Sequence, residues 1–576
     1  MAVENLITEH IDIWTSAVKS KSTSGRGSSK KQELYGVKKL RELILELAVR
    51  GKLVPQNPND EPASVLLEKI AQEQTQLIKD QKIKKLKKLP NISKDELLFD
   101  LPNGWQWCRV GNLFNTIQSG GTPSKREPSY WEGNIPWASV KDLGKSLVLT
   151  DTQDHISEEG LIAGSKLANK GDILICTRMG LGKIAIVSTP MAFNQDLKAV
   201  SLTKYVHTDF FLNSYRTIKI KGTGTTVAGI SQDQLLNYVF SLPPLQEQHR
   251  IVAKVNELMT LCDQLEQQTE ASIEAHQVLV TTLLDTLTNS ADADELMQNW
   301  ARISEHFDTL FTTEASIDQL KQTILQLAVM GKLVPQDPSD EPAAELLKRI
   351  AEEKAQLVKE KKIKKEKALP PIAEDEKPFE LPNGWEWCRF NDAIDVRDGT
   401  HDSPKDATGT NTYPLITSKN FINGKIDFDN ARQISSEDHF EIIKRSQVDK
   451  LDILFSMIGG NIGNQVIVED ERNFSIKNVA LFKYYNVRYT YPYFVFLYTQ
   501  NLAKDLQTKA VGGAQPFISL GALRSLLFAL PPREEQEKIV TKVKELMMLC
   551  DQLIARLKES QATQLHLTDT IVEQAV

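Results

Sequence analysis

Apolar side chains recur at helical spacing through residues 63–88, in a segment without internal Gly or Pro. The apolar positions are Leu66, Leu67, Ile70, Leu77 and Ile83. Pro62 stands where a helix can begin, and Pro90 stands where it must have ended. We therefore predict one helix over the whole segment, and residues 343–369 repeat the pattern and predict a second.

A longer helix is predicted after Pro244, because apolar or small residues recur there in a heptad. The positions in this seam are Ile251, Val255, Leu258, Cys262, Leu265, Leu279 and Leu283. A second copy keeps the register at Ile539, Val543, Leu546, Cys550, Leu553, Leu557, Leu567 and Ile571. A period of 3.5 residues indicates a coiled-coil seam, which Thr269, Ser272 and His276 weaken locally. A helix of about 40 residues is about 60 Å long, so these helices either hold two domains apart or serve only dimerisation.

Residues 110–241 and 390–529 have a different pattern, of short β-type apolar runs separated by Gly, Asn and Pro. GDILICTRMGLGKIAIV at 171–187 is typical of two strands joined by a Gly-rich turn. LDILFSMIGGNIGNQVIV at 451–468 predicts the same hairpin in the second segment.

The chain is an internal duplication. Residues 37–90 match 317–370 at an offset of 280, with 32 of 54 positions identical. LPPLQEQHRIVAKVNELMTLCDQL at 242–265 matches LPPREEQEKIVTKVKELMMLCDQL at 530–553 at an offset of 288. The segments between these blocks diverge, so the chain repeats a scaffold and varies what the scaffold carries. Such an organisation suits two readers held in a fixed relation, each reading something different.

The first copy also carries an insertion. ITEHID at 7–12 resembles ISEHFD at 303–308 at an offset of 296, which leaves 16 additional residues in the first copy. The insertion coincides with a Ser/Gly/Lys stretch from Lys19 to Lys31, which we predict to be a flexible linker. A basic arm that touches DNA is the alternative.

Length and charge limit the possible classes. With 576 residues, the chain is too long for one core and suggests three or four domains. Its net charge of -7 excludes a basic field over the whole chain, so any DNA contact must rest on local patches. No apolar run approaches the roughly 20 residues that cross a bilayer, and the polar N-terminus is unlike a signal peptide. We expect a cytoplasmic protein.

Cysteine and tryptophan are both interpreted as structural. The cysteines form no CxxC pair, so neither a zinc knuckle nor a redox motif is indicated, and buried thiols are expected. They are Cys108, Cys176, Cys262, Cys388 and Cys550. A tryptophan pair follows each LPNG turn, and we expect it to anchor the core rather than stack on bases. The pairs are Trp105 with Trp107 and Trp385 with Trp387.

Polar loops carry the candidate chemistry of the first divergent segment. SGGTPSKREPSYW at 119–131 combines glycines, hydroxyls and cations, a composition suited to phosphate contact. Two further cations flank the glycine turn of the hairpin, from where they could reach a groove. The candidate DNA-binding residues are Gly121, Thr122, Ser124, Lys125, Arg126, Arg178 and Lys183.

In the second segment, RDGTHDSPK at 397–405 occupies the equivalent place, and TSKNF at 417–421 adds polar groups. The candidates here are Arg397, Thr400, His401, Lys405, Ser418, Lys419, Asn420 and Asn461. Arg commonly pairs with guanine, and Asn or Gln with adenine, in bidentate base contacts. For each residue a solvated position on a loop is the alternative.

Local charge is unusually low for a DNA-binding protein. Residues 101–242 hold 14 Lys/Arg and 11 Asp/Glu, and residues 381–530 hold 16 and 17. Either the basic residues cluster on one face, or a partner neutralises much of the phosphate charge.

Taken in order, these motifs make the chain resemble the specificity (S) subunit of type I restriction-modification enzymes. The resemblance rests on the LPxGWxW openings, the GGTPS and DGTHxSP loops, the GDIL and LDIL hairpins, and the LPPLxEQxxIV and LPPxEEQxxIV exits with their heptad helices. Their order and repetition cover nearly the whole chain. The LAVxGKLVPQ blocks resemble the subclass with a long N-terminal region.

The resemblance implies an α+β protein with an internal pseudo-two-fold repeat, in which long antiparallel coiled-coil helices separate two α/β target recognition domains. The expected parts are an N-terminal helical region (1–100), recognition domains at 101–242 and 381–530, a central helical spacer (243–380) and a C-terminal spacer helix (531–576). Half-sites one DNA turn apart lie about 34–36 Å from each other, a distance that such helices span.

The resemblance also implies partners. The target would be double-stranded DNA with two specific parts and an unspecified gap. Two modification subunits would carry S-adenosylmethionine and methylate adenine, and restriction subunits would add an ATP- and Mg-dependent translocating nuclease. We expect no cofactor, metal or catalytic residue in this chain itself.

Two other hypotheses compete. A scaffold that bridges two protein partners without touching DNA is favoured by the low local charge and opposed by the divergence of the two domains. A nuclease or methyltransferase in one chain is opposed because [DN]PP[YF] and GxxxxGK[ST] motifs are missing. GTGTTVAG at 222–229 lacks the spacing of a dinucleotide-binding motif and is predicted to be a loop.

Overall fold

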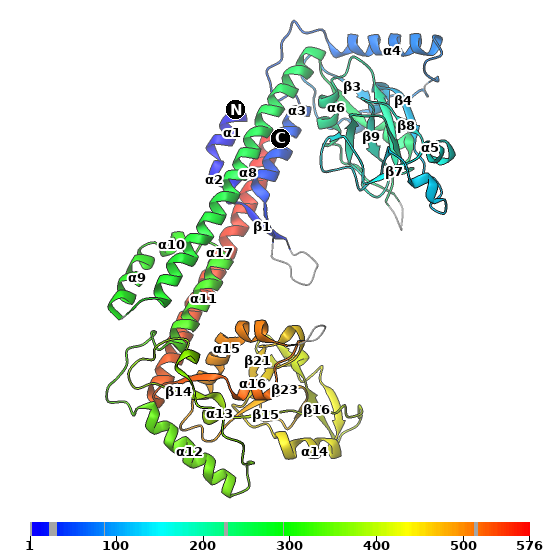
Figure 1. Ribbon diagram of the computed structural model, residues 1–576. Coiled ribbons are helices and arrows are strands. Elements are labelled where there is room, and N and C mark those ends of the chain that lie inside the picture. The colour runs from blue at the N-terminus through cyan, green and yellow to red at the C-terminus, as the bar shows by residue number, and fades with distance from the viewer. Residues whose placement is uncertain (1–2, 22–30, 86, 224–227, 292, 512–515) are drawn as a thin grey trace. The chain divides into compact units, whose positions relative to one another are not determined.

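The computed structural model describes residues 3–21, 31–85, 87–223, 228–291, 293–511 and 516–576. The chain forms two compact units (Figure 1): unit 1 is 1–272 with 560–576, and unit 2 is 273–559. Two long helices, α8 (Leu245–Thr288) and α17 (Arg533–Ala575), each contribute residues to both units. Helices and sheets occur in both units, which confirms the predicted α+β class.

Unit 1 contains a five-stranded sheet in the order β4-β12-β9-β10-β6 and a four-stranded sheet in the order β7-β5-β11-β8. The first comprises β4 (Phe114–Ser119), β12 (Leu197–Leu202), β9 (Ile173–Cys176), β10 (Ile184–Val187) and β6 (Val148–Leu149). The second comprises β7 (Asp154–Ile156), β5 (Ile135–Ala138), β11 (Met191–Phe193) and β8 (Leu167–Ala168). A separate pair joins β3 (Gln106–Arg109) to β13 (Val239–Leu242).

Unit 2 has sheets in the orders β15-β23-β20-β21 and β19-β16-β22. Their strands are β15 (Ile394–Asp398), β23 (Val479–Tyr484), β20 (Ile453–Ser456), β21 (Gln465–Ile467), β19 (Arg432–Ser435), β16 (Thr412–Ile416) and β22 (Ser475–Ile476). Two further pairs join β14 (Glu386–Arg389) to β24 (Leu527–Leu530) and β17 (Phe421–Ile422) to β18 (Lys425–Ile426).

The two units repeat one topology in the segments whose sequences diverge. The order β4-β12-β9-β10 corresponds to β15-β23-β20-β21. In the other sheet, β5 and β16 each have one parallel and one antiparallel neighbour. The predicted hairpins are confirmed as the antiparallel pairs β9–β10 and β20–β21. β9 and β20 are fully buried, which explains why their sequences are continuously apolar.

Helices surround these sheets. Before the first sheets lie α1 (Val3–Glu9), α2 (Ile11–Ser16), α3 (Tyr35–Val49) and α4 (Ala63–Lys79). Unit 1 continues with α5 (Glu158–Gly164), α6 (Thr208–Tyr215) and α7 (Gln232–Asn237). Unit 2 adds α9 (Ala293–Glu305), α10 (Phe307–Leu310), α11 (Glu314–Val329), α12 (Ala343–Lys359), α13 (Phe390–Ala393), α14 (Ser436–Ser446), α15 (Pro492–Lys509) and α16 (Leu520–Arg524).

The helix predicted over 63–88 is shorter than expected, because α4 ends at Lys79. Gln81 has φ +58°, and its amide and the next one donate to the carbonyls of Ile78 and Leu77 at 3.1 and 2.9 Å. This closure satisfies the last carbonyls of the helix and turns the chain away. α12 ends in the same way at Lys359, and Lys361 has φ +59°. No glycine marks the left-handed position in either copy, so the sequence pattern overran both ends.

Both predicted long helices are confirmed, but their burial follows a period of 3.6 rather than 3.5 residues. The heptad register holds at the start of α8, where Ile251 is buried. After the polar stretch it is wrong by one residue: Leu279 is 49% exposed, whereas Val280 is 1% exposed. The repeat shows the same shift at Leu567 (43%) and Thr568 (0%). The side chains therefore follow the period of a straight α-helix through this part.

Repeated motifs meet at a joint in unit 1. Gly51, two residues after the end of α3, has φ +66°, and a Cβ there would lie 2.4 Å from Pro102 and 3.1 Å from Trp105. Only glycine fits this approach of LAVRGKLVPQ to LPNGW. Gln56 of the first motif donates to Glu247 of α8 at 3.2 Å. The scaffold motifs are thus repeated because they hold a sheet-bearing segment to a long helix.

Unit 2 repeats the joint, with Gln336 donating to Glu535 of α17 at 3.1 Å. Trp105 and Trp385 are each 6% exposed, which confirms the predicted core anchors. The outer tryptophans pack against Phe99 and Phe379, with ring centroids 4.9 and 5.0 Å apart. All five cysteines are buried and free, as expected.

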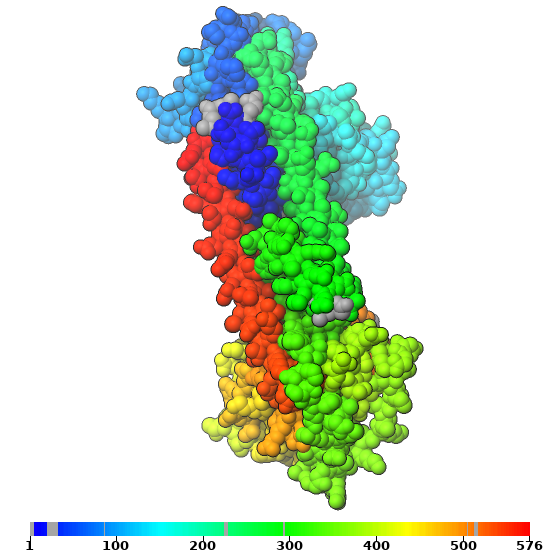
Figure 2. Space-filling view, turned by 90° about the vertical axis from the view of Figure 1, so that its left-hand side faces the viewer, coloured from blue at the N-terminus to red at the C-terminus, as the bar shows by residue number. Residues whose placement is uncertain are grey.

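The predicted linker at 19–31 lies mostly outside the described residues, but its two ends pair as strands. β1 (Val18–Lys21) runs antiparallel to β2 (Lys31–Leu34). The following helix α3 contacts both long helices within unit 1: Arg41 pairs with Asp263 of α8 at 2.7 Å, and Tyr35 donates to Asp569 of α17 at 2.8 Å. In Figure 2 the N-terminal helices, in blue, lie between the red end of α17 and the green α8.

Candidate nucleic-acid interface

One edge of the main sheet gathers several loops in unit 1. Ser119, at the end of β4, pairs with Lys198 near the start of β12. Leu197, the first residue of β12, pairs with Cys176 at the end of β9. Because neighbouring strands here are antiparallel, β4 and β9 end at the edge where β12 and β10 begin. The connections at those points lie side by side although they are distant in sequence.

Unit 2 builds the same edge. Asp398 at the end of β15 pairs with Ala480, and Ser456 at the end of β20 pairs with Val479 at the start of β23. We call the connections at this edge, with the turn after β5 or β16, edge loops 1 to 4. In unit 1 edge loops 1 to 4 are 120–126, 139–142, 177–183 and 194–196. In unit 2 they are 399–405, 417–420, 457–464 and 477–478.

Edge loop 4 of unit 1 is bonded to edge loop 1 and to the end of β5, where edge loop 2 begins. The Gly121 amide donates to the Phe193 carbonyl at 2.9 Å, and the Thr122 hydroxyl donates to the Gln195 side-chain oxygen. The Asn194 amide donates to the Ala138 carbonyl at 2.9 Å, which brings the end of β5 to the same edge.

The bonds recur in unit 2. The Thr400 amide donates to the Ile476 carbonyl at 3.0 Å, and the Lys477 amide donates to the Ile416 carbonyl at 2.9 Å. His401 bonds through Nδ1 to the Asn478 side-chain oxygen at 3.1 Å. Two different sequences thus build one loop arrangement on one frame.

At the edge in each unit, a buried carboxylate is paired with a more exposed basic side chain. Arg178 lies 3.6 Å from Asp196 in unit 1, and the side chains are 52% and 10% exposed. In unit 2, Asp398 is 10% exposed and binds both His401, at 3.0 Å, and Arg445. In each case the basic side chain is the more exposed partner, so Arg178 and Arg445 present positively charged donors that suit phosphate or base acceptors.

Comparison with known proteins decides the family. The family model for the type I restriction modification DNA specificity domain matches residues 102–275 and 382–560. The specificity subunits of the type I restriction enzymes EcoAI and EcoEI of Escherichia coli are 42% and 41% identical, each over 100% of both chains. This chain belongs to the type I restriction-modification specificity subunits. Those subunits recognise DNA targets and are not catalytic, as the sequence predicts.

A solved chain of a type I restriction-modification system overlaps 83% of this specificity subunit and 98% of its own length. That chain is 17% identical, with a TM-score of 0.46.

In this specificity subunit the sequence candidates of unit 1 fall into two groups. Gly121 and Thr122 hold edge loop 1 by the bonds described above, and Lys183 donates to the Val140 carbonyl at 3.1 Å. These three stabilise the loops. The other candidates remain exposed at the edge, namely Ser124, Lys125, Arg126 and Arg178.

Two candidates of unit 2 bond to residues of their own loop or strand. Asn420 is 8% exposed, and its side-chain oxygen accepts from the amide and hydroxyl of Thr417 at 3.0 and 3.1 Å. It closes edge loop 2. Arg397 lies within β15 and bonds to Asp395 at 2.6 and 2.9 Å. The remaining candidates lie on the edge loops, namely Thr400, His401, Lys405, Ser418, Lys419 and Asn461.

Four residues of the edge loops were not predicted from the sequence. Lys141 is exposed in edge loop 2 of unit 1, at the position that Lys419 takes in unit 2. Gln195 lies in edge loop 4 of unit 1, and Lys477 and Asn478 form edge loop 4 of unit 2. Their signal is a short polar turn directly before a buried strand in both copies, FNQDLKAV and SIKNVALF. It is weak because such turns are common in β-proteins.

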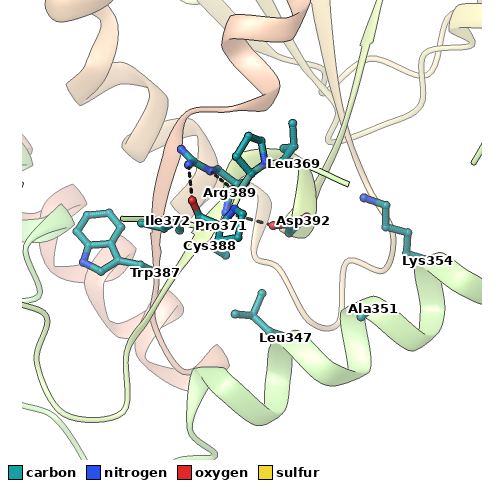
Figure 3. Close-up of a pocket in the computed structure, with 11 residues that line it drawn as sticks. Leu347, Ala351, Lys354, Leu369, Pro371, Ile372, Trp387, Cys388, Arg389 and Asp392 are labelled. Atoms are coloured by element: carbon teal, nitrogen blue, oxygen red, sulfur yellow. Dashed lines mark hydrogen bonds between the residues drawn. The ribbon is translucent and has the colours of Figure 1, made fainter. Parts of the chain in front are cut away.

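A cavity of about 500 Å³ lies away from the edge loops in unit 2. Figure 3 shows Leu347 and Lys354 of α12 on one side and Arg389 with Pro371 on the other. Apart from Asp392, its lining residues lie outside the divergent segment 390–529. Such a place does not suit the reading of a target that differs between the two halves.

No group of three or more His, Cys, Asp or Glu side chains is placed to hold a metal ion among the residues that the structure describes. The same residues include no helix of sufficient length and apolarity to cross a membrane.

Proposed function

We propose that the edge loops of the two units read the two parts of an asymmetric, interrupted DNA target. This proposal rests on the observation that the two units have the same arrangement of strands but different residues in the edge loops. Edge loop 4 is Asn194-Gln195-Asp196 in unit 1 and Lys477-Asn478 in unit 2, on strands of identical order. If both units bound the same partner, there would be no reason for the loop residues to differ while the arrangement of the strands stays the same.

In this proposal residues 101–242 and 381–530 are the two target recognition domains. The helical parts at 243–380 and 531–576 form the antiparallel spacer between them, with 1–100 as an N-terminal helical region. The length of the spacer helices fixes the unspecified gap in the target.

Two modification subunits and the restriction subunits are the protein partners. The modification subunits supply S-adenosylmethionine and adenine methylation, and the restriction subunits supply ATP- and Mg-dependent cleavage. The low charge of residues 381–530 supports a partner role in DNA binding, because 16 Lys/Arg against 17 Asp/Glu leave little net charge to neutralise phosphates.

The test is selection from a random duplex library by this chain co-expressed with its modification subunits. Recovery of one sequence in two parts with a fixed gap is expected. An intact complex that recovers no sequence would favour the scaffold that bridges two proteins.

A further inference from the structure

The side-chain amides of Gln195 and Asn478 occupy the same place in the two units. Each belongs to edge loop 4, directly before the first residues of β12 or β23. In both units the amide oxygen is hydrogen-bonded to a side chain of edge loop 1. The Thr122 hydroxyl donates to it in unit 1, and His401 Nδ1 lies 3.1 Å from it in unit 2 and donates to it when that nitrogen carries a proton. A hydroxyl in unit 1 and an imidazole in unit 2 therefore hold the amide oxygen of edge loop 4 at corresponding places.

The donors themselves are held in place. His401 bonds through Nε2 to Asp398 at 3.0 Å, and both ring nitrogens donate when the ring is protonated. Thr122 follows Gly121, whose amide bonds to the Phe193 carbonyl at 2.9 Å. The anchored amides thus have rigid supports, which a group that discriminates between bases requires.

An amide whose oxygen is held in this way offers its NH2 group to a ligand. The usual pairing of Gln or Asn with adenine needs oxygen and nitrogen to face the base together, and here the oxygen faces edge loop 1. Guanine shows two acceptors, O6 and N7, in the major groove, and thymine shows one, O4, beside its methyl group, whereas adenine and cytosine place a donor there. An NH2 group alone matches guanine best.

We infer that Gln195 and Asn478 each read a guanine through the amide NH2 group, one in each part of the target. This inference rests on the proposed function of the edge loops and names the base that each loop selects.

The test uses Gln195→Glu and Asn478→Asp, which keep the shape and one oxygen but replace the NH2 donor by an acceptor. Each variant is co-expressed with the modification subunits and used in the same selection from random duplex. Gln195→Glu is expected to lower the preference for guanine at one position of one part by about tenfold, within the range of a good base contact. Asn478→Asp is expected to do so only in the other part.

Matched controls are Gln268→Glu, on the exposed surface of α8, and Asn473→Asp, an exposed position before β22, at the end of that strand away from edge loop 4. Both should leave the selected sequence unchanged. Thr122→Val should broaden the same position as Gln195→Glu, whereas Thr122→Ser keeps the hydroxyl and should not. This second pair carries the test if an acidic variant fails to assemble.

The outcomes are separable. A wild-type complex that selects two parts, with variants that select the same sequence at every position, would overturn the role of these amides and leave the proposed function standing. A change at a position occupied by another base would overturn the assignment of guanine. A wild-type complex without sequence preference would overturn the proposed function and this inference together.

Discussion

Glu376 holds the buried guanidinium of Arg389 with both carboxylate oxygens, at 2.9 Å each. Arg389 also donates to the carbonyls of Pro370, Pro371 and Ser525. The arginine thereby ties the start of a recognition segment, its end and the strand β14 together. Unit 1 repeats the arrangement with Glu96 and Arg109, so this ion pair belongs to the scaffold.

The Glu96 pair predicts a loss of stability in acid. Hydrogen bonds from Arg109 and Ser93 lower the pKa of Glu96 to about 2. The unfolded chain therefore takes up this proton first, so the stabilisation is present above about pH 4.5 and is lost as the pH falls towards 2. Glu96→Gln should remove this part of the pH dependence, measured by thermal unfolding at pH 3 and pH 6. Glu132→Gln, at an exposed site, should not, and equal acid sensitivity in wild type and Glu96→Gln would contradict the prediction.

Lys361→Gly should stabilise the protein. Lys361 holds the left-handed conformation that closes α12, at φ +59°, and a side chain is strained there. Glycine removes the strain and costs some entropy of the unfolded chain, for a net gain of about 0.5 kcal/mol. Thermal unfolding should show the increase. Lys362→Gly, one residue later, adds entropy to the unfolded chain without relieving backbone strain in the folded state. A higher unfolding temperature for that control as well would contradict the explanation.

Asp452 predicts a pH effect of the opposite sign. Burial raises the pKa of Asp452 to about 6, against the opposing effect of Lys483 at 2.5 Å. The folded state retains this proton longer than the unfolded chain, so stability at this site falls as the pH rises from about 4 to about 6. Asp452→Asn should remove that fall, with the Lys483 ammonium still held by Asp449 at 2.7 Å. Unfolding in urea at pH 4, 5, 6 and 7 measures the effect, and an unchanged slope in the variant would count against it.

Lys125→Gln and Lys405→Gln should weaken DNA binding by the complex without changing the selected sequence. Both lysines are exposed on edge loop 1, where we propose phosphate contacts. Each lost contact should lower the slope of log affinity against log salt concentration by about 0.9. Titrations from low to high salt measure this slope. Lys170→Gln, before β9 at the opposite edge of the sheet, is the matched control, and an equal effect there would show that general charge is responsible.

The sequence by itself determined the duplication, the long helices, the two hairpins and the family. These features rest on local chemistry: helical spacing of apolar side chains, continuous apolar runs for buried strands, and motifs repeated at a constant offset. Local pattern also had limits. It predicted α4 too long, because Gln81 takes a left-handed conformation that is usual for glycine. It also predicted the wrong buried residue in α8 after the polar stretch, where Val280 rather than Leu279 is buried.

Only the tertiary structure decided which loops meet. Thr122 and Gln195 are 73 residues apart, and antiparallel pairing of β4, β12 and β9 brings their loops to one edge. Lys183, a candidate that could reach a groove, donates instead to the Val140 carbonyl, 43 residues away in the sequence. A side chain's availability to a ligand depends on partners that are distant in sequence, and the chain pattern does not contain those distances.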